Sequence, residues 1–247
     1  MSSTTGTSLI NKLQTSLPRG TPFDSVALKR LGISSALAHH YLRAGWLTRL
    51  GRGVFMFAGD TLQRDSTLKF LSSKIPGLHV GGKTALAWQG FRQNLSHRET
   101  ICLWGEGKAT LPPWFREHFA SRYTAINLFS SALPRGFGLY PLPETPQGPL
   151  VSAPERALLE MLCEVGVRQE VGEARNIMET VRNLRAEELA VLLKSCHMIK
   201  VVRLCVLWAE ELDLPWAHSA REAVGHKLGT GRWVKRLKDG STLILKP

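Results

Sequence analysis

Apolar residues at the start of the chain recur three or four positions apart, which is helical spacing. They predict a helix over residues 3–17, ended by Pro18 and a nearby glycine. A second, short helix is expected between Asp24 and Gly32. Asp24 is a residue type that caps a first turn, and glycine commonly ends a helix.

A third helix and a hairpin follow. Ser34 can cap a helix that runs through Ala44 before another glycine. Two apolar stretches, residues 46–50 and 54–57, flank a Gly-Arg-Gly turn, a pattern typical of a β-hairpin. Helix, short helix, turn, helix and hairpin in this order predict a winged helix-turn-helix domain over residues 1–60.

The pattern changes from residue 61 onward to alternating helical and extended stretches without repeats. Ser152 and Glu155 have the spacing of a capping box, and the proline-rich residues 133–150 predict a loop with edge strands. We expect helices near residues 65–75, 84–89, 112–123, 152–162, 168–183, 186–195 and 198–212. We expect strands near residues 79–82, 100–104, 125–129, 233–237 and 241–245, the last two forming a hairpin around Asp239-Gly240. The predicted fold is α+β, with a mixed α/β domain over residues 61–247 after the winged helix.

The third helix has two chemically different faces. At 100° per residue, Leu37, Tyr41 and Ala44 share one face and predict the packed side. Ser35 and His39 lie on the opposite face, together with Arg43. A hydroxyl, an imidazole and a guanidinium are groups that reach phosphates and base edges in a DNA major groove.

The charge balance favours the same partner. Thirty-two Lys and Arg residues against twenty Asp and Glu give a net charge of +12, which suggests a polyanionic ligand. Residues 1–60 hold seven basic and two acidic residues, and Arg49 and Arg52 lie in the hairpin. We expect double-stranded DNA to be bound by Lys29, Arg30, Ser34, Ser35, His39, His40, Arg43, Arg49 and Arg52. A helical unit used only for packing, or for docking a protein, is the plainer alternative.

Composition indicates a soluble, cytoplasmic protein. No apolar run approaches the ~20 residues of a membrane helix, and the N-terminus lacks the basic and apolar stretches of a signal peptide. The four cysteines contain no C-x-x-C pair, which argues against disulfides and for a reducing compartment.

Three tempting motifs fail on context. Residues 77–84 match G-x-x-x-x-G-K-T, but the stretch before them is helix-like, so we expect a turn before a helix rather than a phosphate-binding loop. Glu106-Gly107-Lys108 resembles the end of a nuclease strand, yet Glu99 and Asp65 are its only nearby carboxylates, at unconvincing spacing. Cys196-His197 with Cys205 lacks the paired spacing of a zinc site. We therefore expect no catalytic residues, no metal and no cofactor.

The stretch around residue 201 predicts an amphipathic helix with Lys200 and Arg203 on one face. A solvated face is the plainer interpretation of these cations, and a docking surface for an anionic partner is the alternative. We assign Lys200, Arg203 and Arg232 as candidate partner-binding residues.

The chain resembles a known family along nearly its whole length, and several of its motifs occur in order. These are Leu31-Gly32-Ile33-Ser34, Tyr41-Leu42-Arg43-Ala44-Gly45-Trp46-Leu47, Leu50-Gly51-Arg52-Gly53-Val54-Phe55, the G-G-x-[ST]-A-L segment at 81–86, the S-x-P-E-R-A helix start at 152–157, the stretch Val201 to Trp208, and Leu228-Gly229-Thr230-Gly231-Arg232. Together they resemble the AbiEi-type antitoxins. The G-G-x-[ST]-A-L likeness also explains the apparent phosphate-binding loop.

The resemblance implies a two-part protein. The winged helix of the family binds inverted repeats at its own promoter and represses the operon, which places the DNA-reading helix at Ser34–Ala44 and the wing at Arg49–Phe55. The C-terminal domain of the family counteracts a nucleotidyltransferase-like toxin, with or without direct contact, in type IV phage-defence systems. The alternative is a winged-helix regulator with a sensing domain and no toxin partner. A nuclease or an NTPase is the third class.

Overall fold

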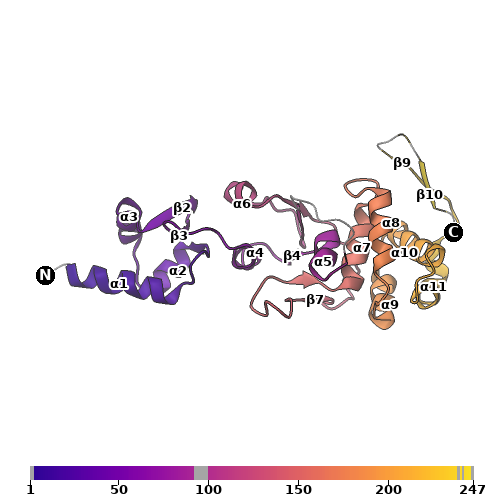
Figure 1. The fold of residues 1–247 in the computed structure, drawn as a ribbon, viewed down its shortest axis with the longest axis horizontal. Coiled ribbons are helices and arrows are strands. Elements are labelled where there is room, and N and C mark those ends of the chain that lie inside the picture. The colour runs from indigo at the N-terminus through magenta and orange to yellow at the C-terminus, as the bar shows by residue number, and fades with distance from the viewer. Residues whose placement is uncertain (1–2, 92–99, 238–239, 241, 246–247) are drawn as a thin grey trace. The chain divides into compact units, whose positions relative to one another are not determined.

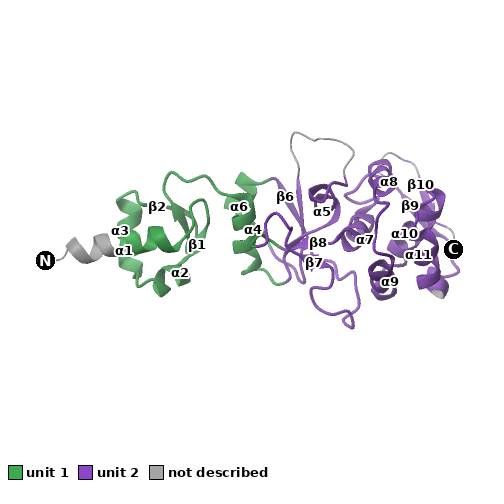
Figure 2. Cartoon of the chain, turned by 60° about the horizontal axis from the view of Figure 1, so that its bottom comes forward, with its two compact units in different colours: residues 1–76, 110–119, 147–149 green, residues 77–109, 120–146, 150–247 purple. Residues whose placement is uncertain are grey.

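The computed structural model of the chain describes residues 3–91, 100–237, 240 and 242–245, with the backbone alone at 3–8 and 226. The chain forms two compact units (Figure 2). Unit 1 comprises residues 1–76, 110–119 and 147–149. Unit 2 comprises residues 77–109, 120–146 and 150–247. The two units are thus interleaved in sequence, because the chain enters unit 1 three times.

Unit 1 begins with the predicted winged helix-turn-helix (Figure 1). Its elements are α1 (Ser3–Ser16), β1 (Phe23–Asp24), α2 (Ser25–Arg30), α3 (Ser35–Arg43), β2 (Leu47–Gly51) and β3 (Val54–Phe57). The three strands form an antiparallel sheet in the order β1-β3-β2. The predicted helices and hairpin of this region are confirmed.

Local chemistry explains where these helices begin. The Asp24 carboxylate accepts a hydrogen bond from the Ala27 amide at 2.8 Å, and the Ser34 hydroxyl accepts one from the Leu37 amide at 3.2 Å. Both bonds satisfy amides that the first turn leaves without a helical partner. A core of buried residues then holds the helices against the strands, including Leu13, Leu28, Ile33, Tyr41, Phe55 and Phe57.

Unit 1 extends beyond the predicted segment 1–60. It also contains α4 (Arg64–Ser72) and α6 (Pro113–His118), whose rings Phe70 and Trp114 lie 6.4 Å apart. The backbone carbonyl of Gln147 accepts a hydrogen bond from the Lys69 ammonium at 2.7 Å, which ties the third chain segment to α4. Long-range contacts of this kind carry no local sequence signal.

Unit 2 is built on a mixed sheet of five strands in the order β6-β5-β4-β8-β7. The strands are β4 (His79–Val80), β5 (Ile101–Trp104), β6 (Ser121–Thr124), β7 (Leu139–Tyr140) and β8 (Val151–Ser152). Strands β5 and β6 are parallel, and the connection between them contains α6 of unit 1. Helices α5 (Gly82–Trp88) and α7 (Pro154–Glu164) pack together beside the sheet.

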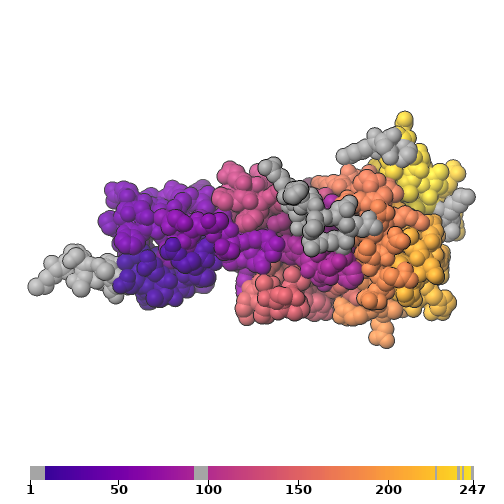
Figure 3. All heavy atoms as spheres, in the orientation of Figure 1, coloured from indigo at the N-terminus to yellow at the C-terminus, as the bar shows by residue number. Residues whose placement is uncertain are grey.

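A helical layer completes unit 2 and forms a closely packed body, orange to yellow in Figure 3. It contains α8 (Val171–Thr180), α9 (Ala186–Ser195), α10 (Ile199–Glu211), α11 (Ala217–Val224) and a 3-10 turn (Gly225–Leu228), followed by the hairpin β9 (Trp233–Arg236) and β10 (Thr242–Leu245). The α+β fold is confirmed. Among the described residues, every helix is too short or too polar to span a lipid bilayer.

Several predicted elements of this region are wrong. The helix expected over 112–123 ends at His118, and the strand lies at Ser121–Thr124 rather than at 125–129, where residues 125–127 are exposed and Phe129 forms an isolated bridge with Cys196. The cause is backbone pairing with β5, because residues 121–124 form a strand along β5 although their local pattern is helical. Helix α11 was not predicted. Asp239, at the tip of the predicted C-terminal hairpin, lies outside the described residues.

The predicted capping box at Ser152 is also wrong. Helix α7 begins at Pro154 after Ala153, and no side chain caps it. The Ser152 hydroxyl instead donates a hydrogen bond to Glu160 at 2.8 Å, while Glu155 is buried and accepts hydrogen bonds from Arg185. Both side chains therefore bind partners beyond the first turn of α7 and do not cap the helix.

Candidate nucleic-acid interface

The residues predicted to contact DNA share one property in the structure: all nine are exposed. On α3, the buried residues are Ala38 and Tyr41, and Leu37 is half-buried. The prediction that Ala44 packs is wrong, because α3 ends at Arg43 and Ala44 is exposed at its C-cap. The helix therefore presents its polar residues to solvent and holds itself to unit 1 through the opposite face.

A groove of about 580 Å³ runs between α2, α3 and the hairpin β2–β3. Six of the nine predicted residues line it: Lys29, Ser34, Ser35, His39, Arg49 and Arg52. Arg30, His40 and Arg43 are exposed outside this lining. Leu42 also lines the groove while packing partly against the core, which explains an apolar residue close to the polar face of α3.

The cations of this groove are free to meet an external anion. Among the described residues, no carboxylate pairs with Lys29, Arg49 or Arg52; the Arg49 guanidinium lies over the Phe55 ring at 6.0 Å. The two acidic residues of the first 60, Asp24 and Asp60, are held elsewhere, by Lys74 and Arg19. The positive potential of the groove is therefore not neutralised from within unit 1.

Asp24 stays ionised in its pair with Lys74. Burial raises the pKa of Asp24, but the Lys74 ammonium and the Ala27 amide outweigh it and leave that pKa lowered. The carboxylate therefore fulfils two structural roles, capping α2 and tying it to Lys74, and does not compete for the cations of the groove.

The hairpin β2–β3, here called the wing, is anchored at both sides of its turn. Gly53 adopts a φ of +70°, and its carbonyl accepts a hydrogen bond from the Ser25 amide at 3.0 Å. Gly51 lies so close to the Trp114 ring that a Cβ atom added there would be 3.0 Å from Trp114 Cδ1. The turn that carries Arg52 is thus held on both sides.

The predicted partner-binding residues Lys200 and Arg203 are buried, so the expectation of an exposed face is wrong. The Lys200 ammonium donates to the carbonyls of Cys163 and Val165 at 2.7 and 2.9 Å, and burial lowers its pKa. The Arg203 guanidinium donates to the carbonyls of Leu228 and Leu245.

Helix α10 is buried almost all round, and this explains the error. Its two cations satisfy carbonyls inside unit 2 instead of facing solvent. The apolar runs on both sides of Arg203 were the available signal. Arg232, by contrast, is exposed.

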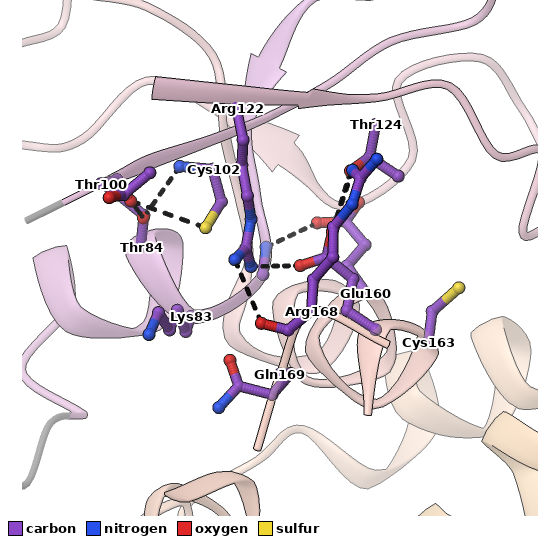
Figure 4. A network of polar contacts seen from close by, with 12 residues as sticks. Lys83, Thr84, Thr100, Cys102, Arg122, Thr124, Glu160, Cys163, Arg168 and Gln169 are labelled. Carbon is purple, nitrogen blue, oxygen red and sulfur yellow. Dashed lines mark hydrogen bonds and ion pairs between the residues drawn. The ribbon is translucent and has the colours of Figure 1, made fainter. Parts of the chain in front are cut away.

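The segment that matched a phosphate-binding loop has structural contacts. Lys83 forms an ion pair with Glu173 at 2.8 Å, and the Thr84 hydroxyl donates to the carbonyl of Thr100 and accepts from the Cys102 amide (Figure 4). A short strand, β4, lies within the motif, and α5 begins at Gly82. These contacts join α5 to the sheet and to α8.

The other rejected motifs take similarly plain positions. Glu106 and Lys108 are exposed after β5, and Glu99 lies outside the described residues. All four cysteines are free and buried, and burial raises the pKa of Cys163 and of Cys196 to about 11. Among the described residues, no group of three or more His, Cys, Asp or Glu side chains could hold a metal ion.

One polar network in unit 2 has no counterpart in the sequence-based predictions. The buried Glu160 carboxylate accepts hydrogen bonds from His79 Nε2 (3.0 Å), Arg156 Nε (2.8 Å), the Gly82 amide (3.0 Å) and the Ser152 hydroxyl (2.8 Å). Burial raises the pKa of Glu160, but His79 and Arg156 outweigh it and lower the pKa to about 2. The G-G-x-[ST]-A-L and S-x-P-E-R-A segments, about 70 residues apart in sequence, meet at this carboxylate.

Comparisons with known proteins agree with this architecture. A family model described as transcriptional regulator, AbiEi antitoxin of a type IV toxin–antitoxin system, matches residues 98–243, and a model of the AbiEi antitoxin N-terminal domain matches residues 6–97. The crystal structure of the RV2827C protein from Mycobacterium tuberculosis is similar, with a TM-score of 0.60 and 15% identity over 92% of this chain and 83% of that one. At this identity the likeness concerns the fold alone. No curated protein matches the sequence.

The two family models together account for most of both units. The chain therefore belongs to the AbiEi antitoxins of type IV toxin–antitoxin systems, a family of transcriptional regulators.

Proposed function

We propose that this protein is an antitoxin that represses its own operon by binding inverted repeats in its promoter through the groove of unit 1. The observation that carries the proposal is the groove itself, where Ser35 and His39 on α3 face the same space as Arg49 and Arg52 on the wing. Helix α3 supplies groups suited to base edges in a major groove, and the wing supplies cations for phosphates.

Binding of the full chain to its own upstream DNA tests this half of the proposal. The duplex is compared with a scrambled duplex of equal length, by fluorescence anisotropy at two salt concentrations. Operator recognition predicts selective binding that survives physiological salt, whereas charge alone predicts equal and salt-sensitive binding to both duplexes.

Two variants then locate the contact. Arg52→Ala and Arg43→Ala remove exposed cations from the wing and from α3, and Arg116→Ala removes an exposed cation of the same unit that does not line the groove. Weaker binding of Arg52→Ala, with Arg116→Ala unaffected, supports the groove as the contact. Weaker binding of Arg43→Ala extends the contact along α3 beyond the groove lining, and unchanged binding of both variants contradicts the proposal.

We further propose that unit 2 counteracts a nucleotidyltransferase-like toxin in a phage-defence system. Support comes from family membership, since AbiEi antitoxins act within type IV toxin–antitoxin systems. Co-expression of the chain with the toxin encoded beside it measures rescue of growth. Rescue that persists in Arg52→Ala assigns the two activities to different parts of the chain, and loss of rescue in a folded variant argues against that division.

The alternative of a winged-helix regulator whose second domain senses a ligand makes an opposite prediction. It requires no toxin gene beside this one and no growth rescue by the chain. It predicts the same selective binding to the upstream DNA as the antitoxin proposal. The growth-rescue experiment therefore separates the two candidates.

A further inference from the structure

Unit 2 contains a pocket of about 400 Å³ that the proposed function does not use. It lies where β4 begins and β5 ends, and the loop over residues 126–139 forms its outer wall. That wall is held by backbone hydrogen bonds from the Ser130 amide to the Ser195 carbonyl (2.8 Å) and from the His197 amide to the Leu128 carbonyl (3.0 Å). The pocket is therefore preformed, and its volume is in the range of small-molecule sites.

The floor of this pocket is the Glu160 network, and its negative charge is already matched. Each oxygen of the carboxylate accepts two hydrogen bonds. His79 is engaged at both ring nitrogens, by Glu160 at 3.0 Å and by the Gly77 carbonyl at 2.7 Å. The floor consequently offers an incoming molecule no spare acceptor and no uncompensated carboxylate.

Donors around the pocket, in contrast, remain unused. Trp104 is 2% exposed, and its indole nitrogen has no hydrogen-bond partner. Arg156 donates a hydrogen bond from Nε to Glu160 and another from Nη1 to the Phe137 carbonyl. No described residue accepts a hydrogen bond from its Nη2. Arg135 is exposed on the wall, and no described carboxylate pairs with it. The Trp104 indole nitrogen is enclosed near Gly82, which does not line the pocket, so the two arginines are the donors that a molecule in the pocket can reach.

Apolar surface lies beside these donors. Ile126 is 42% exposed, and the Phe129 ring stacks under the Arg156 guanidinium at 5.1 Å. Glu106 on the rim is the remaining charged group of the lining, and it disfavours a highly charged polyanion. The combination fits a small molecule with one anionic head and an apolar body.

We propose that this pocket binds a small organic anion, whose carboxylate or phosphate head is held by Arg135 and Arg156 and whose apolar body lies against Ile126 and Phe129, beside the Trp104 ring. Guanidinium groups match the geometry of both kinds of head. The site is separate from the DNA-binding groove, and its occupation is measured without DNA or toxin.

Nuclear magnetic resonance of the full chain labelled with ¹⁵N at tryptophan tests the proposal. The indole peak of Trp104 is identified by its loss in Trp104→Phe, or by a paramagnetic label on the wall if that variant does not fold. The chain is titrated with benzoate, with phenyl phosphate and, as a neutral counterpart, with benzamide. We expect a saturable shift of the Trp104 peak with at least one of the two anions and none with benzamide.

Variants of exposed cations decide whether the pocket is responsible. Arg135→Ala is expected to weaken binding about ten-fold, the effect of losing one charge-assisted hydrogen bond. The matched control Lys108→Ala, an exposed cation of unit 2 outside the pocket lining, is expected to leave it unchanged. The preferred anion then identifies the head group. The proposal is overturned if neither anion gives a saturable shift, if benzamide binds as tightly, or if Arg135→Ala binds like the parent chain.

Discussion

Cationic side chains have opposite fates in the groove of unit 1 and in helix α10 of unit 2. In unit 1, Lys29, Arg49 and Arg52 line an open groove, and no described carboxylate pairs with them. In unit 2, Lys200 and Arg203 are buried against backbone carbonyls, although both contribute to the net charge of the chain. The net charge of +12 therefore overstates the positive charge that a polyanion can contact at the surface.

The difference is physical rather than compositional. A cation removed from water needs acceptors around it, so a buried Lys or Arg becomes part of the packing of its unit. An exposed cation contributes little to stability and remains available for ligands. Substitution of a buried cation should consequently affect folding, and substitution of an exposed cation should affect binding.

The strongest test of this contrast is Glu160→Gln in unit 2. The amide directs a donor at groups that already donate. It leaves Arg156 without its buried counter-charge and His79 Nε2 without a carboxylate partner. We expect the free energy of unfolding to fall by about 3–5 kcal/mol, as for other broken buried ion pairs. Chemical denaturation measures it, and the exposed Glu106→Gln should change it by less than about 0.5 kcal/mol.

The same carboxylate should make stability depend on acid. Its pKa is lowered in the folded chain, from 4.5 to about 2. The stabilisation is therefore fully present above pH 4.5 and is lost as the pH falls from there toward 2. The gap in unfolding free energy between the parent chain and Glu160→Gln should narrow across that window, and a constant gap would contradict the assignment.

A smaller effect is expected from Arg203→Ala. The Leu228 and Leu245 carbonyls would lose their donor, and the hairpin β9–β10 would lose an anchor. We expect a loss of about 1–3 kcal/mol, the cost of unsatisfied buried groups, with faster amide hydrogen exchange in β9 and β10. The exposed Arg232→Ala serves as control, and equal effects of both variants would remove the distinction between buried and exposed cations.

The smallest effect on folding is expected in the wing. Arg49→Ala and Arg52→Ala should each leave the unfolding free energy within about 0.5 kcal/mol. Each should make the slope of log affinity against log salt concentration less steep by about 0.9, which is the contribution of one phosphate contact on duplex DNA. An unchanged slope in both variants, measured on the upstream duplex, would show that the wing does not contact phosphates.

Sequence reasoning succeeded in the winged helix because its signals are local. Caps at Asp24 and Ser34, glycines after the helices and a Gly-Arg-Gly turn each act within a few residues, so the elements of unit 1 were predictable. The exposure of Ser35, His39 and Arg43 followed from helical periodicity in the same way. The convergence of the nine proposed DNA-binding residues on one groove did not, since Arg30, His40 and Arg43 lie outside its lining.

Unit 2 shows where local signals end. Residues 121–124 form a strand because β5 offers them backbone partners, and Ser152 leaves its predicted capping role because Glu160 lies within reach. Similarly, α6 pairs Trp114 with Phe70 across a long stretch of sequence, although it is encoded between two strands of unit 2. Such partners depend on the closed fold.

The sequence by itself determined the winged helix, the α+β class and the family, since periodicity, caps and ordered motifs are properties of neighbouring residues. Only the tertiary structure decided which cations are buried, which segments complete unit 1, and that two distant motifs meet at Glu160 beside an open pocket. The physical reason is that burial and charge pairing depend on which residues approach in space, and an amino-acid pattern specifies such approaches only through the whole fold.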